Sequence, residues 1–134
     1  MKRLPNNALH KALIKFLRDK QPTPVYDYVP DKIQLPYITL GAINVQDRST
    51  KTDDITHLSI AIHIFSTYKG RFEVNNLAEN IINLLASEQL DLDFEGFYVT
   101  EQGVDFYESY PEDDLGYSGV ITLETTIQNV KGDN

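Results

Sequence analysis

An alternating run at residues 55–65 limits the possible folds of this chain more than any other segment. Aliphatic residues occupy every second position, namely Leu58, Ile60, Ile62 and Ile64, and shorter or polar residues lie between them. A period of two places alternate side chains on opposite faces of a β-strand. We therefore expect a strand whose isoleucines lie in the core and whose other face is polar or shared.

Two further segments have the 3, 4, 7, 8 spacing of amphipathic helices. Residues 7–20 carry this pattern after Asn6 or Asn7, either of which would serve as the N-cap. Pro22 and Pro24 end the segment, because proline lacks the backbone donor and favours an extended predecessor. Residues 71–87 have a second apolar stripe, formed by Val74, Leu77, Ala78, Ile81, Ile82 and Leu85.

The rest of the chain has the composition of strands and turns. We expect strands at about 25–29, 37–45, 90–94, 97–110 and 117–130, with a possible bulge at Gly41. The order of helix, strands, helix and strands predicts an α+β fold, a mainly antiparallel β-sheet with two amphipathic helices packed on one face. At 134 residues, with 41% hydrophobic and 24% charged residues, residues 1–134 are expected to form one domain.

Charge and composition argue against nucleic-acid binding, cysteine-based sites and membrane association. A net charge of -8 repels a phosphate backbone, so specific nucleic-acid binding is not expected. The chain has no cysteine, and therefore neither disulfides nor thiolate metal sites. No apolar stretch suits a signal peptide or membrane span, so we expect no membrane partner.

The strongest candidate for a metal site is the series Asp91, Asp93, Glu95 and Gly96, which matches the first half of a calcium-binding loop. The twelfth position is Gln102 where such a loop needs a glutamate, so acids on the solvent face of a hairpin are the favoured interpretation.

The three histidines offer no zinc site. His57 and His63 lie six residues apart in a predicted strand, a separation of roughly 20 Å. His10 falls on the polar face of the first helix. We expect no metal and no cofactor, and a small metal-dependent enzyme using the three acids and a distant histidine remains the alternative.

Candidate catalytic motifs are incomplete. Residues 116–119 resemble a nucleophile elbow around Ser118, but Val120 stands where the motif requires glycine. Residues 69–71 lack a phosphate-binding glycine loop, and the acids at 112–114 are typical of a solvated turn. The chain is therefore predicted not to be an enzyme.

Two features suggest protein binding. The segment 46–54 is longer than a usual hairpin turn and carries both signs of charge. The chain also has eight tyrosines, a residue enriched at protein interfaces. A mobile loop and ordinary sheet aromatics explain these features about equally well, and a cellular adaptor domain is a further alternative.

Several segments in a fixed order resemble the tail completion, or tail-to-head joining, proteins of siphophages. These segments are 25–30 (VYDYVP), 35–41 (LPYITLG), 47–52 (DRSTKT), 64–66 (IFS) and 68–71 (YKGR), followed by a closing strand after an acidic turn. The resemblance extends over residues 4–130, and the combination is more specific than any single segment.

The resemblance implies a virion protein that caps the head-proximal end of the tail tube as a ring of six copies. Its expected partners are the tail tube protein and the head-completion (stopper) protein, and DNA would pass through the ring without specific binding. Assembly would take place in the cytoplasm of a bacterial host. Within this implied ring, the segment 46–54 would reach a neighbouring subunit through Asp47, Arg48, Lys51, Asp53 and Asp54.

Overall fold

The computed structural model describes residues 1–67, 70–112 and 116–131. Two α-helices, a short 3-10 helix and five strands follow one another along the chain. Their order is α1 (Asn6–Lys20), β1 (Val25–Tyr26), β2 (Tyr37–Asp47), β3 (Ile55–Ser66), α2 (Phe72–Ser87), η1 (Asp93–Glu95), β4 (Phe97–Glu112) and β5 (Gly116–Asn129).

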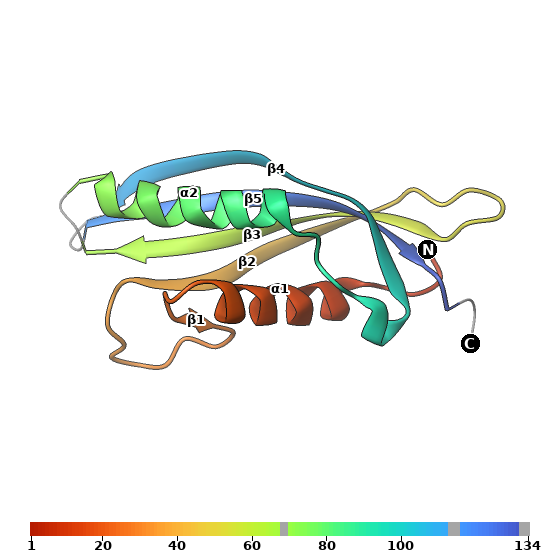
Figure 1. The fold of residues 1–134 in the computed structure, drawn as a ribbon, viewed down its shortest axis with the longest axis horizontal. Helices are drawn as coiled ribbons and strands as arrows, with labels where there is room; N and C mark the ends of the chain where they lie inside the picture. Colours follow the sequence, from red (N-terminus) through yellow and green to blue (C-terminus); the bar gives the residue numbers. More distant parts are fainter. Residues whose placement is uncertain (68–69, 113–115, 132–134) are drawn as a thin grey trace.

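The five strands form one sheet in the order β1-β2-β3-β5-β4 (Figure 1). Neighbouring strands are antiparallel except for β1 and β2, which are parallel. The register between β2 and β3 shifts between Leu40 and Ile43, which confirms the expected bulge at Gly41. The alternating strand β3 thus occupies the centre of the sheet.

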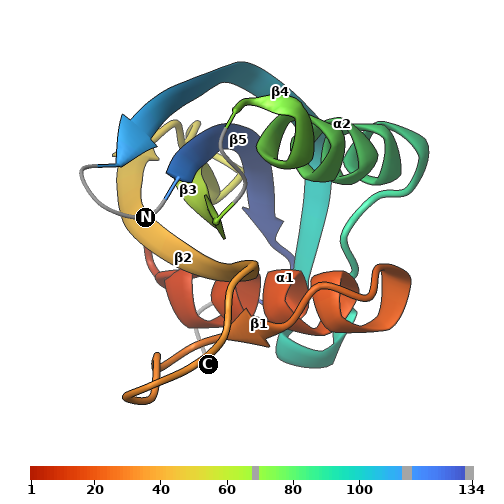
Figure 2. The same cartoon turned by 90° about the vertical axis from the view of Figure 1, so that its left-hand side faces the viewer.

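Both helices lie on one side of the curved sheet (Figure 2). The even-numbered residues 58–64 of β3 are fully buried there, together with Leu9, Leu13 and Leu17 of α1 and Ile81 of α2. Full burial of one such side chain contributes about 1.5–3 kcal/mol. The predicted α+β fold class, with both amphipathic helices on one face, is confirmed.

The prediction of a strand at residues 90–94 is wrong. Leu90 and Leu92 are buried as their alternation suggests, but Phe94 is 53% exposed. The backbone turns instead, because Asp91 accepts a hydrogen bond from the N–H of Asp93, and η1 and a left-handed Gly96 follow. Two leucines that fill the core from a turning segment produce the same alternation as a strand.

Other predicted boundaries need smaller corrections. The strand expected at 25–29 is only Val25–Tyr26, since pairing with β2 involves these two residues alone. Helix α1 begins at Asn6, and the N-cap position is Pro5 without a side-chain hydrogen bond, so the predicted asparagine cap is wrong. The remaining helix and strand ends differ from the predictions by at most two residues.

The opposite face of the sheet is not covered by a helix in the described part of the chain (Figure 2). Its central residues, including His57, Ala61 and Val120, are half-buried among their neighbours on adjacent strands. Among the described residues, no helix is long and apolar enough to cross a membrane.

Candidate docking surfaces

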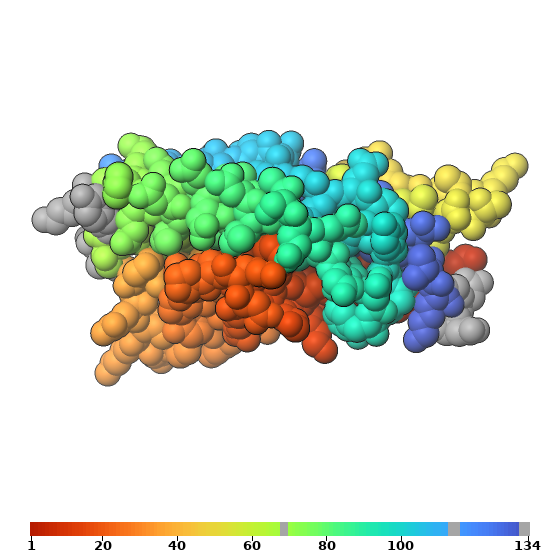
Figure 3. All heavy atoms as spheres, in the orientation of Figure 1, coloured from red at the N-terminus to blue at the C-terminus, as the bar shows by residue number. Residues whose placement is uncertain are grey.

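The hairpin connecting β2 to β3 projects from one end of the molecule (Figures 1 and 3), and we call residues 46–54 the arm. Its base continues the strand ladder through the N–H of Arg48, which donates to the carbonyl of Ile55 at 2.9 Å. Its tip is closed by the N–H of Thr50, which donates to the carbonyl of Asp53 at 2.9 Å. The arm is therefore an ordered hairpin extension.

Ser49 holds the two sides of the arm together. Its hydroxyl donates to Asp54 at 3.2 Å and accepts from the N–H of Ile55 at 3.1 Å, while its own N–H donates to Asp47 at 3.0 Å. The bonds to Asp54 and Ile55 cross the hairpin where strand pairing ends. Sequence reasoning missed Ser49, since a serine in a polar loop carries no distinctive pattern.

Both ends of the described chain meet the base of the arm. The amino group of Met1 donates to Asp47 at 3.1 Å, and the N–H of Lys2 donates to Asp54 at 3.1 Å. From β5, the amide of Asn129 donates to Asp54 at 2.9 Å. Asp54 thus connects the N-terminal segment, the arm and the last strand.

Hydrogen bonding stabilises the ionised form of these aspartates. The hydroxyl and N–H of Ser49, with the amino terminus, hold the pKa of Asp47 at about 2, below its usual 3.8. Partial burial acts to raise the pKa of Asp54, but bonds from Asn129, Lys2 and Ser49 outweigh it and lower that pKa. The arm base is therefore anionic near neutral pH.

The five predicted contact residues divide into two groups. The first group comprises the three aspartates, which accept hydrogen bonds from groups of the same chain: Asp47, Asp53 and Asp54. Asp53 accepts one from the side-chain amide of Gln128 at 3.3 Å. Arg48 and Lys51 are exposed. The guanidinium of Arg48 donates to the neighbouring Gln46 at 2.6 Å, and the side chain of Lys51 forms no hydrogen bond or ion pair with a described residue. The two cations are the arm's outward-facing charges.

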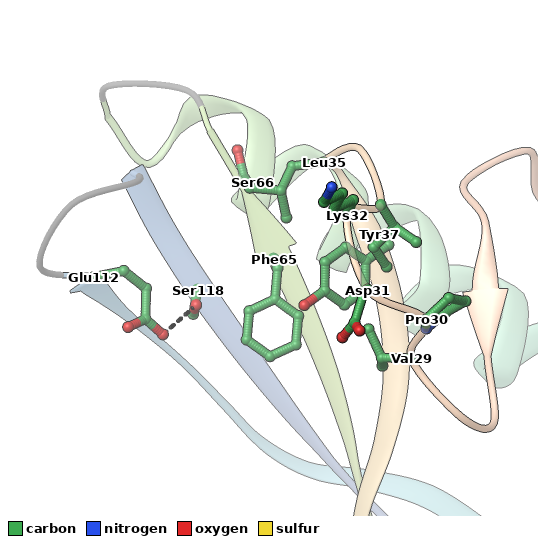
Figure 4. A pocket seen from close by; sticks show the side chains of 11 residues that line it. Val29, Pro30, Asp31, Lys32, Leu35, Tyr37, Phe65, Ser66, Glu112 and Ser118 are labelled. Atoms are coloured by element: carbon green, nitrogen blue, oxygen red, sulfur yellow. Dashed lines mark hydrogen bonds between the residues drawn. The ribbon is translucent and has the colours of Figure 1, made fainter.

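A cavity of about 630 Å³ lies at the other end of the sheet, between the 29–35 loop and the ends of β2, β3, β4 and β5 (Figure 4). The rings of Tyr37 and Phe65 stack along its wall with centroids 4.8 Å apart. Opposite them, Ser118 donates to Glu112 at 2.6 Å. This aromatic cavity is open and has both apolar and anionic walls.

The structure also locates the motifs that sequence analysis considered for catalysis and metal binding. Ser118 lies within β5, and Arg71 stacks over Tyr117 at 4.8 Å and donates to Ser109. The residues Lys69, Asp113 and Asp114 fall outside the described part.

The histidines lie far apart in the fold. His57 is 3.6 Å from Glu124 on the open sheet face, and His10 is 3.3 Å from Asp27 beside α1. Among the described residues, no group of three histidine or acidic side chains is arranged to hold a metal ion.

The fold and these surfaces define a two-layer α+β protein, one sheet covered by helices on one face, with a projecting arm at one end and an aromatic cavity at the other. The chain belongs to the tail completion protein gp17 family, whose model matches residues 8–128. Membership of this family makes it a structural protein of a virion tail. No curated protein matches the sequence.

Among solved structures, the chain resembles one from the virion of a native gene transfer agent (GTA) particle. The two share 20% sequence identity, with a TM-score of 0.77 over 92% of this chain and 96% of that chain. At this identity, the similarity demonstrates a shared fold.

Proposed function

We propose that this chain caps the head-proximal end of a phage tail tube and joins the tail to the head-completion protein. The family match over residues 8–128 carries the proposal. The aromatic cavity, at the end of the molecule opposite the arm, offers a docking surface for one of the two assemblies that the joint connects (Figures 1 and 4). The role proposed is structural and involves neither a cofactor nor catalysis.

The working form is a ring of six copies at the end of the tail, through which DNA passes. A net charge of -8 suits this path, because like charge keeps DNA from adhering to the channel wall. Arg48 and Lys51 of the arm reach a neighbouring copy in the ring. Before it meets the tube, in the host cytoplasm, the protein is a monomer or weak oligomer.

Removing the gene from its phage tests the proposal. We expect filled heads and free tails that fail to join, counted by electron microscopy, with joining restored when the protein is supplied from a plasmid. Normal joined particles in the absence of the protein would overturn the proposed function.

A further inference from the structure

The charges of this chain are divided unequally along its sequence. Residues 1–71 contain 11 lysines and arginines against six acids, a net charge of +5. Residues 72–134 contain one lysine against 14 acids, a net charge of -13. Together these values give the total of -8, so the chain is acidic only because its second half is.

The topology converts this division into two sides of one molecule. The first half forms α1, β1, β2 and β3, and the second forms α2, β5 and β4. Because the sheet order is β1-β2-β3-β5-β4, the strands of the two halves lie side by side without interleaving. The segment 88–95 of the second half reaches α1, where Glu88 pairs with Lys20 at 3.2 Å. Figures 1 and 2 show α1 and β4 on opposite sides of the molecule.

Helix α1 presents a basic surface on its outer side. Lys11, Lys15 and Arg18 are exposed and follow one another at helical spacing, and they line a shallow depression together with His10. Two acids, Asp19 and Asp27, border the same depression. Lys15 is paired with Asp19 at 2.7 Å, so three permanent cations against two carboxylates leave this surface with one net positive charge.

Strand β4 presents the opposite charge at the other side. Its 16 residues, Phe97–Glu112, include no lysine or arginine. Glu101, Asp105 and Glu108 are exposed and form no hydrogen bond or ion pair with another described residue. In the described part of the chain, β4 pairs only with β5, so its outer edge is open.

We propose that copies of this chain associate head to tail, with the outer surface of α1 on one copy against the acidic β4 side of the next. The proposal rests on the proposed ring and specifies its subunit contact. A repeated contact between two different surfaces closes into a ring when the rotation between copies permits it. Opposite charges on the two sides favour this polarity, because the reverse pairings place like charges together.

Charge reversal at the two surfaces tests this contact in a phage that lacks the gene. One variant carries Lys11→Glu and Lys15→Glu, a second carries Glu101→Lys and Glu108→Lys, and a third combines all four changes. Arg18 is left intact because it donates to the carbonyl of Val25 at 2.9 Å. Circular dichroism and thermal melting check that each variant folds.

We expect each double variant to lower the yield of joined particles about tenfold or more, because its two contacting sides then repel. The fourfold variant restores the yield, since it inverts the polarity of every contact while keeping the sides complementary. A contact with the tube or the head would stay broken in that variant, so the rescue is specific to contacts between copies.

Two results would overturn the inference, namely folded double variants that join as well as wild type, or a fourfold variant that gives no rescue. Failure of the wild-type plasmid to restore joining would instead contradict the proposed function. Complementation with the wild-type plasmid therefore tests the proposed function separately from the contact between copies.

Discussion

Asp47 and Asp54 at the base of the arm hold the N-terminal segment and the last strand to the hairpin, since they accept hydrogen bonds from Met1, Lys2 and Asn129. The mixed charge of residues 46–54 marks the segment as unusual, but nothing in the pattern distinguishes Asp47 and Asp54, which bond within the chain, from Arg48 and Lys51, which face outward. That distinction depends on Asn129 and Lys2, which approach only after folding. Pair assignments of this kind need the tertiary structure.

Replacing Ser49 with alanine tests the role of its hydroxyl. The change removes the hydroxyl, which is the largest contribution to the lowered pKa of Asp47, so we expect the pKa of that carboxylate to rise from about 2 toward 3.8. Because folding depresses this pKa, the stabilisation is complete above the unfolded value and is lost as pH falls toward 2.

Carbon-detected NMR titration of the Asp47 side chain measures the shift, with Thr52→Ala in the same loop as the control. An unchanged titration midpoint in Ser49→Ala would contradict the assignment.

At the scale of elements, segments with long, regular apolar periods are the ones predicted well. The alternation of β3 and the stripes of α1 and α2 persist over three or more turns or pleats, so packing and local pattern agree. The strand prediction at residues 90–94 fails because two alternating leucines also fit a turn. The hydrogen bond from the N–H of Leu90 to the side chain of Gln102 joins residues twelve apart, and no local pattern indicates it.

The arm is expected to contribute to assembly through its two outward-facing cations, Arg48 and Lys51, and substitution of both tests this. Replacing Arg48 and Lys51 with alanine leaves the bonds of Ser49, Asp47 and Asp54 intact, so stability should change by less than about 0.5 kcal/mol. We expect fewer capped tails, because the outward cations no longer reach the neighbouring copy.

Exchanging the two residues as Arg48→Lys with Lys51→Arg preserves both charges and serves as the matched control. Tail capping at the wild-type level in the alanine variant would refute a role for the arm.

At the scale of the whole molecule, the sequence predicts the fold class and the family correctly. The position of the two docking surfaces at opposite ends follows from the sheet, since the 29–35 loop and the arm lie at opposite ends of β2 and β3. The charged sides likewise depend on which strands become neighbours. Strand order joins segments distant in sequence, which local patterns do not encode.

The proposed function requires this protein to occupy the head-proximal end of the tail tube. Electron microscopy of free tails, isolated from a phage lacking the gene and incubated with the purified protein, shows where on the tube the protein binds. We predict added density at one end of each tube, opposite the tip, with mass matching six copies. Density at the tip or along the tube, or tubes that remain bare, would contradict the claim.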